Sequence, residues 1–146
     1  MVETPTSGNA NPCKVCNPSF VTLSCLIVDD NRAFLDAASA LLQREGLTVA
    51  GVASTSAEAL QDVDRLRPQV VLVDVFLGEE SGFDLARSLT KNGRGHATAV
   101  ILISTHAESE LSDLLDESPA LGFVSKADLS ASAIFRIMRG RADGSA

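Results

Sequence analysis

The sequence predicts an α/β protein built on a doubly wound, parallel sheet of five strands. One observation is that short apolar runs alternate, from Ser24 onward, with segments whose apolar residues repeat at helical spacing. A second is that most of these runs are apolar at consecutive positions, which is typical of strands covered on both faces by helices. The 146 residues suffice for one domain with a substantial core.

Five apolar runs are the expected strands. They are residues 25–28, 47–53, 70–73, 100–103 and 121–124. The segments that follow them carry apolar residues three and four positions apart and are the expected helices. Their apolar positions lie at 34–42, 60–66, 83–89, 111–115 and 134–138.

Local signals mark where several helices begin and end. Gly46 and Pro68 end the first and second helices. Thr55 with Glu58 forms a capping box for the second helix, and Thr105 with Glu108 forms one for the fourth. Residues 78–82 are expected as a polar turn and residues 92–95 as a helix breaker.

Right-handed crossovers between these units predict helices on both faces of the sheet. The run at 47–53 is the least apolar and suits an edge, which favours the flavodoxin-like order 2-1-3-4-5. In that order the first and third strands are neighbours. Their carboxyl ends are therefore the expected place for a ligand.

The division of the chain is predicted as a tail at 1–22, a domain at 23–140 and a short tail at 141–146. Three of the five prolines lie in the first segment. The segment also holds Cys13 and Cys16 at C-x-x-C spacing, which suits a soft metal or a redox pair but lacks the other ligands of a zinc site. We expect an inert tail, with intermolecular metal or disulfide pairing and redox chemistry as alternatives, and we expect Cys25 to be a small core residue.

Composition excludes several classes of function. A net charge of −7 argues against direct nucleic-acid binding, because phosphate backbones are held by clustered Lys and Arg. No apolar run approaches the length of a membrane span, and the N-terminus shows no secretory signal. We therefore expect a cytoplasmic protein that does not enter a membrane.

Polar residues follow four of the strands, and Asp74 is the central one. Asp29 and Asp30 follow the first strand and converge with Asp74 in the predicted order. Three clustered carboxylates repel one another unless a cation intervenes, and Mg²⁺ prefers such oxygen ligands. A carboxylate beside Mg²⁺ can attack phosphorus, while Ser104 and Lys126 offer a phosphoryl group one neutral donor and one cation.

This constellation resembles the receiver domain of bacterial two-component response regulators over roughly residues 24–140. The resemblance rests on an acid pair after strand one, a lone acid with Gly82 eight residues later, Ser after strand four, and Phe123 followed by Lys126. It implies a signalling switch rather than a turnover enzyme, in which Asp74 accepts a phosphoryl group from a histidine kinase or phosphotransfer protein.

The resemblance also implies roles for the neighbouring residues. Asp30, Asp74 and the backbone carbonyl of Phe76 would coordinate Mg²⁺, and Asp29 would help through water. Lys126 would contact the phosphoryl group. Ser104 and Phe123 would move inward on phosphorylation and reshape the face of the fourth helix, fifth strand and fifth helix, the expected surface for a partner, an output domain or a homodimer.

The sequence departs from many receivers at two places. Leu77-Gly78 stands where Met-Pro is common, and Ala127 replaces a proline, so we expect a trans bond after Lys126. Phe76 and His106 occupy positions that tune loss of the phosphoryl group in the family, and a shielding Phe76 implies a long-lived phosphoform.

Plainer interpretations stand beside these. The cluster Asp29-Asp30-Asn31 also suits an ordinary helix N-cap, and Thr105 competes with Ser104 for the site. Phe123 also suits plain core, and we expect His106 to be an exposed loop residue rather than a metal ligand. Alternative functions are a degenerate, non-phosphorylated binding module, a Mg²⁺-dependent phosphatase-like enzyme, or a flavin protein, which Asp29 and Asp30 disfavour because they repel phosphate.

Overall fold

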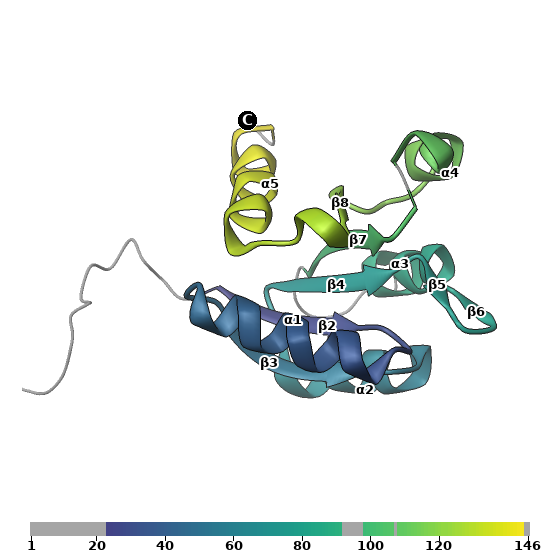
Figure 1. Ribbon diagram of the computed structural model, residues 1–146. Helices are drawn as coiled ribbons and strands as arrows, with labels where there is room; N and C mark the ends of the chain where they lie inside the picture. The colour runs from purple at the N-terminus through teal and green to yellow at the C-terminus, as the bar shows by residue number, and fades with distance from the viewer. Residues whose placement is uncertain (1–22, 92–97, 107, 145–146) are drawn as a thin grey trace, which may run out of the picture.

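The computed structural model describes residues 23–91, 98–106 and 108–144 (Figure 1). Its strands are β2 (Ser24–Val28), β3 (Thr48–Ala53), β4 (Val70–Asp74), β5 (Phe76–Leu77), β6 (Glu80–Ser81), β7 (Ala99–Ser104) and β8 (Gly122–Ser125). Its α-helices are α1 (Arg32–Arg44), α2 (Ser56–Leu66), α3 (Gly82–Lys91), α4 (Ser112–Asp116) and α5 (Ala131–Gly144). Two 3₁₀ turns, η3 (Glu108–Glu110) and η4 (Lys126–Asp128), precede α4 and α5. The C-x-x-C and the breaker at 92–95 lie outside the described residues.

The main sheet has the order β3-β2-β4-β7-β8, and all its neighbouring strands are parallel. By chain order of these five strands this is 2-1-3-4-5, so the predicted fold and the edge position of β3 are confirmed. The strand arrows point to one end of the sheet, where the β5–β6 hairpin also lies (Figure 1). The carboxyl ends of β2 and β4 are therefore adjacent.

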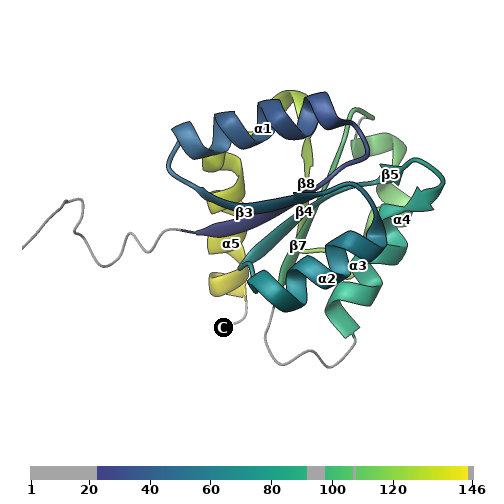
Figure 2. The ribbon, with the colours of Figure 1, turned by 90° about the horizontal axis from the view of Figure 1, so that it is seen from below.

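Helices cover both faces of the sheet, with α1 on the opposite side from α2 and α3 (Figure 2). Along β2, Cys25 and Ile27 pack with residues of α1 and α5, whereas Leu26 and Val28 pack with residues of α2 and α3. All four side chains are fully buried. The consecutive apolar run is explained by this alternation, because successive side chains of a strand point to opposite faces.

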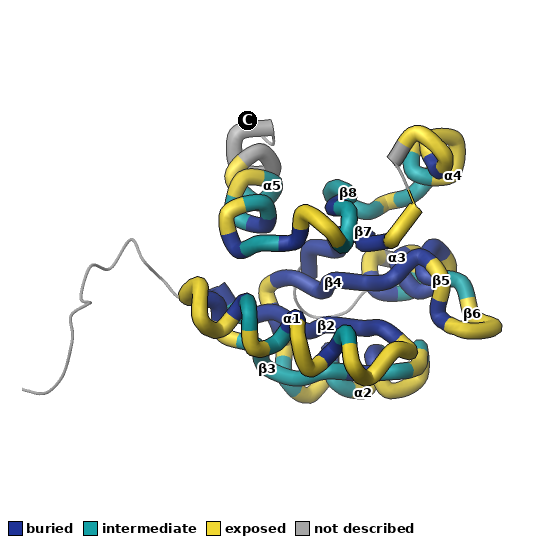
Figure 3. The backbone as a smooth tube through the Cα atoms, viewed as in Figure 1, coloured by how far each residue is buried: buried dark blue, intermediate teal, exposed yellow. Residues whose placement is uncertain are grey.

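Burial follows the same layers, with buried strands between helices whose outer surfaces are exposed (Figure 3). Cys25 is a core residue, as predicted, and burial raises the pKa of its thiol to about 11. The thiol is therefore protonated at neutral pH and is a poor nucleophile. Among the described residues, no helix has the length and apolar character needed to cross a bilayer.

Several predicted helix boundaries are confirmed. Gly46 follows the end of α1 with φ of 106°, a conformation that glycine adopts without strain. At the start of α2, the Thr55 hydroxyl accepts a hydrogen bond from the Glu58 N–H at 3.1 Å. The Glu58 carboxylate in return accepts from the Ser54 N–H at 2.9 Å, one residue earlier than a capping box places it. The end of the last helix differs from the prediction, because α5 continues past residue 140, the expected end of the domain, to Gly144.

The fourth helix is shorter than the sequence predicts. It begins at Ser112, not after Thr105, and its N-cap residue Leu111 makes no side-chain capping hydrogen bond. The physical reason lies just after β7, where the Ser104 hydroxyl accepts from the His106 N–H at 3.0 Å. Such a side-chain turn competes with helix formation. Leu114, expected on the apolar face, is 51% exposed.

The segment expected as a polar turn forms the antiparallel β5–β6 hairpin, with Phe76 paired to Ser81. Gly82 begins α3 directly behind Asp74. A Cβ atom at this position would overlap the Asp74 carbonyl oxygen, so only glycine fits. The Gly82 N–H donates to the Val75 carbonyl at 2.8 Å, which holds α3 close to the end of β4.

Candidate functional site

Three aspartates meet at the carboxyl ends of β2 and β4. Val28 is in register with Val73, so Asp29 and Asp74 reach the same edge side by side. One carboxylate oxygen of Asp29, Asp30 and Asp74 lies within 4.8 Å of each of the other two. Asp29 and Asp74 are buried, whereas Asp30 is exposed. The predicted convergence of the acids is therefore present in the structure.

Backbone hydrogen bonds orient the two buried carboxylates. The Asn31 N–H donates to Asp29 Oδ1 at 2.9 Å, and the Phe76 N–H donates to Asp74 Oδ1 at 3.2 Å. The second oxygen of each carboxylate is left for other partners. Asn31, rather than the acid pair, is the N-cap of α1, since its side chain accepts from the Phe34 N–H. The expected helix-cap cluster is thus confirmed at Asn31, and neither acid is the N-cap residue of α1.

Lys126 occupies the space between these second oxygens. Its Nζ lies 2.6 Å from Asp29 Oδ2 and 3.2 Å from Asp74 Oδ2, and its side chain is only 14% exposed. The ammonium also lies 4.3 Å from the centroid of the Phe34 ring, a cation–π contact. The lysine predicted from its place after the fifth strand therefore reaches the acids. The described peptide bonds are all trans, including the bond after Lys126.

The contact with Phe34 is absent from the sequence prediction, which assigned Phe34 to the apolar face of the first helix. The sequence does place Phe34 in the first turn of a helix that starts just after the acid pair, and this position could have indicated a contact with the site. The ring packs against the core and also presents a face to Lys126. This contact and the two ion pairs fix the ammonium over the buried acids.

Burial and mutual repulsion raise the pKa of Asp74. Desolvation is the largest cause and the charge of Asp29 adds to it, while Lys126 and the Phe76 N–H act in the opposite direction. For Lys126, burial by itself lowers the pKa of the ammonium, but hydrogen bonding and charge from Asp29 and Asp74 outweigh it and raise the pKa overall. Lysine is therefore held as a cation, yet one positive charge does not neutralise three aspartates.

The donor set fits a hard divalent cation. Mg²⁺ is bound by carboxylate and carbonyl oxygens and keeps several waters, and this pocket offers three carboxylates with one of them exposed. Among the described residues, the buried Asp29 Oδ2 has the Lys126 ammonium as its partner and accepts no other bond. Gly78, with φ of 60°, leaves room beside the exposed acid, because a Cβ there would lie 3.3 Å from Asp30 Oδ2.

Ser104 ends β7 at the same edge of the sheet. Its preceding neighbour Ile103 is in register with Asp74, and Ser104 itself is in register with Ser125 on β8. The residue is only 1% exposed, whereas Thr105 is exposed. These positions favour Ser104 over Thr105 as the hydroxyl of the site.

His106 is exposed, as predicted, but it makes contacts that the sequence did not indicate. Its Nδ1 lies 3.3 Å from Ser104 Oγ, in addition to the bond from its backbone N–H. Its ring lies against that of Phe76, with centroids 4.9 Å apart and planes tilted by 54°. Phe76 is 49% exposed and lies in β5 of the hairpin that follows Asp74.

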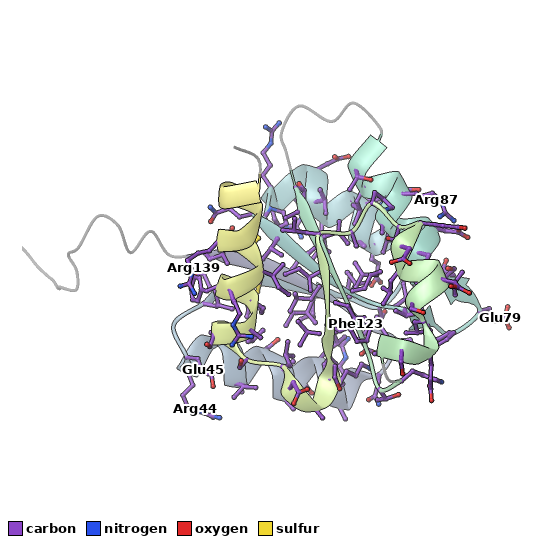
Figure 4. The ribbon with its side chains drawn as sticks, turned by 90° about the horizontal axis from the view of Figure 1, so that it is seen from above. Arg44, Glu45, Glu79, Arg87, Phe123 and Arg139 are labelled. Atoms are coloured by element: carbon purple, nitrogen blue, oxygen red, sulfur yellow. The ribbon has the colours of Figure 1, made fainter. Side chains whose placement is uncertain are left out.

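Phe123 lies on β8 between α4 and α5 (Figure 4). It pairs with Leu102 and packs, partly exposed, against the cluster on the α2 and α3 side of the sheet. It does not contribute to the acid pocket in this structure, and its role in switching stays a prediction.

A parallel sheet of this order, with clustered acids and a lysine at its carboxyl edge, is the architecture of a receiver-type signalling domain. The family model "Response regulator receiver domain" matches residues 25–135, and the chain belongs to this family. It is thus a receiver domain of two-component systems.

Curated relatives match this region over part of their own length. The response regulator protein TmoT of Ectopseudomonas mendocina is 34% identical over 100 residues, covering 68% of this chain and 44% of TmoT. The transcriptional regulatory protein YdfI of Bacillus subtilis is 28% identical over 114 residues, covering 77% of this chain and 52% of YdfI. The chain thus spans about half the length of these relatives.

Solved structures agree in fold. A two-component response regulator of the LuxR family from Aurantimonas sp. SI85-9A1 has a TM-score of 0.69 at 22% identity, covering 82% of this chain and 86% of that one. At this identity the likeness shows the fold alone.

Proposed function

We propose that this receiver accepts a phosphoryl group on Asp74 from the phosphohistidine of a histidine kinase or phosphotransfer protein, in a Mg²⁺-dependent reaction. The observation that carries the proposal is the convergence of three aspartates within 4.8 Å, with Lys126 bridging the two buried ones. Such a cluster is costly to the folded protein unless it serves a cation and a charged reactant.

The reaction is an in-line displacement on phosphorus. A carboxylate oxygen of Asp74 forms the new bond to phosphorus as the phosphorus–nitrogen bond of phosphohistidine breaks, and the electron pair leaves with the imidazole. Lys126 contacts the phosphoryl oxygens, and Ser104 donates a hydrogen bond to one of them. The Phe76 N–H holds Asp74 Oδ1 in place during the transfer.

Asp30, Asp74 and the backbone carbonyl of Phe76 are the proposed direct ligands of Mg²⁺, with Asp29 acting through water. The bound ion would neutralise charge on the acids and on the transferring group. Asp30 is the exposed member of the cluster, which suits an ion that enters from solvent. Asp29 is fully buried and already paired with Lys126, which suits an indirect role.

The proposed output is a change of the face formed by α4, β8 and α5, where Ser104 and Phe123 respond to the phosphoryl group. Leu114 on α4 leaves 51% of its surface exposed, and Phe123 is not fully buried. These residues support this face as the surface for a partner, an output domain or a second copy. A transcriptional output is one such case, as the names of the regulatory relatives suggest.

The test is incubation of the chain with acetyl phosphate and Mg²⁺, followed by intact mass. The proposal predicts stable addition of one phosphoryl group, lost in Asp74→Asn and in the presence of a chelator. Asp84→Asn, which changes an exposed aspartate of α3, is the matched control and should still be phosphorylated.

The other outcomes select the alternatives. Continuous release of phosphate without accumulation would indicate the phosphatase-like enzyme. No reaction with a folded protein would indicate a binding module that is not phosphorylated. Either result would contradict the proposal.

A further inference from the structure

The Ser104 hydroxyl is engaged by His106 in the described structure. The His106 backbone N–H donates to Ser104 Oγ at 3.0 Å, and His106 Nδ1 lies 3.3 Å from the same oxygen. A serine hydroxyl has one proton to donate and two lone pairs to accept with. The backbone N–H uses one lone pair, so the second contact decides whether the hydroxyl proton is free.

The position of the His106 ring is itself supported. The Phe76 ring lies against it with centroids 4.9 Å apart, and the Phe76 N–H donates to Asp74 Oδ1. One row of contacts therefore joins Asp74, Phe76, His106 and Ser104. The contact with Phe76 therefore favours the ring position that brings Nδ1 to Ser104, although His106 is an exposed residue.

We propose that His106 is a positioning residue whose Nδ1 accepts a hydrogen bond from the Ser104 hydroxyl in the resting protein and so keeps that donor from a phosphoryl group on Asp74. The inference rests on the proposed function, because it needs Ser104 to donate to the phosphoryl group. Phosphorylation must then exchange the bond to His106 for the bond to phosphate. The exchange biases the domain toward its resting form by about the strength of one hydrogen bond.

The size of the effect follows from that exchange. A hydrogen bond of this kind contributes about 0.5–1.5 kcal/mol net, which corresponds to a change in affinity of roughly twofold to thirteenfold. Because the bond is made only before the phosphoryl group arrives, removing it strengthens phosphoryl binding. A residue that only shaped access to the site would change the rates of binding and release, and its effect would not depend on the Ser104 hydroxyl.

The experiment measures the dissociation constant of beryllofluoride, a mimic of the phosphoryl group, in saturating Mg²⁺. His106→Ala is expected to tighten binding by roughly twofold to thirteenfold. In a Ser104→Ala background the same change should have no effect, since no hydroxyl proton remains to be withheld. His106→Asn supplies an amide oxygen as acceptor and should restore the weaker wild-type affinity.

An equal effect of His106→Ala with and without the Ser104 hydroxyl would overturn the inference, as would weaker binding in His106→Ala. A second readout is independent of the ligand. Nitrogen NMR of histidine-labelled protein, with the His106 signals assigned by loss in His106→Ala, should show an unprotonated Nδ1 that shifts in Ser104→Ala. A protonated Nδ1 would overturn the inference, because the hydroxyl would then be free.

Failure of the proposed function gives a different pattern. If wild-type protein binds no beryllofluoride, the proposed function and the competition both fail, whatever the histidine signals show. If the wild type binds and only the difference between variants is missing, the proposed function stands and the role of His106 falls.

Discussion

Replacing Lys126 with methionine tests how the two buried acids are held. Methionine keeps an unbranched chain over Phe34 but removes the charge that lies 2.6 Å from Asp29 Oδ2 and 3.2 Å from Asp74 Oδ2. Removing one partner of a buried pair costs about 3–5 kcal/mol, because a charge is left without a partner. Since the lysine side chain is 14% exposed and solvent reaches Asp30, we expect the lower end, about 3 kcal/mol.

The assay is urea unfolding without divalent cations, comparing the free energy of unfolding of wild type and variant. The matched control is Arg87→Met, which removes the arginine of an ion pair with Asp84 whose side chains are 48% and 72% exposed. Exposed pairs contribute at most about 1 kcal/mol, so this control should be nearly neutral. Equal small losses in both variants would refute the idea that Lys126 stabilises the acids.

The pH dependence of the free energy of unfolding is a second part of the same test. The pKa of Asp74 is raised, so between about 4, the ordinary value for aspartate, and its higher folded value the folded protein binds more protons than the unfolded chain. Protonation of Asp74 therefore increases the free energy of unfolding as the pH falls through this window. Without Lys126 the pKa of Asp74 rises further, so the loss of stability in the variant should shrink at lower pH. Saturating Mg²⁺ at neutral pH should shrink it as well.

Three further predictions concern residues around the site. Gly82→Ala should cost about 3 kcal/mol of stability or more and reduce phosphorylation, because its Cβ would overlap the Asp74 carbonyl oxygen. Gly51→Ala is the control and should cost less in the same urea assay, because its Cβ would meet only methyl groups of Leu66 and Leu26. Asp30→Asn should stabilise the cation-free protein by about 1 kcal/mol through lost repulsion and should abolish stabilisation by Mg²⁺, which thermal unfolding with and without the ion would check. Phe76→Ala should shorten the lifetime of the phosphoform severalfold by admitting water, measured by the decay of the phosphorylated mass; an unchanged lifetime would show that the half-exposed ring does not shield Asp74.

The strand order and the acid cluster were predictable because both follow from short-range patterns. Consecutive apolar residues such as Leu26 and Ile27 belong to strands buried on both faces, and the structure buries both fully. Once the order of the strands is known, residues directly after each strand must share one edge. The prediction therefore reached Asp29, Asp74 and Lys126 without any knowledge of loop conformation.

What the sequence could not predict depends on side-chain directions just beyond the strands. The Ser104 hydroxyl bonds to the His106 N–H and holds the chain in a turn, so the helix expected from the Thr105 and Glu108 pattern begins later, at Ser112. Leu111, Leu114 and Leu115 do have helical spacing, but local hydrogen bonding by the Ser104 side chain competes with helix formation before Ser112. Likewise, the contact between Phe34 and Lys126 joins residues far apart in the chain and needs the fold to be seen.

The most direct measurement is a crystal structure of the chain with Mg²⁺ and beryllofluoride. The account predicts beryllofluoride on Asp74, with a single ion about 2.0–2.1 Å from oxygens of Asp30, Asp74 and the Phe76 carbonyl. It also predicts Lys126 and Ser104 in contact with the fluorides. An empty pocket at saturating concentrations, with the carboxylates of Asp29, Asp30 and Asp74 turned away from one another, would contradict it.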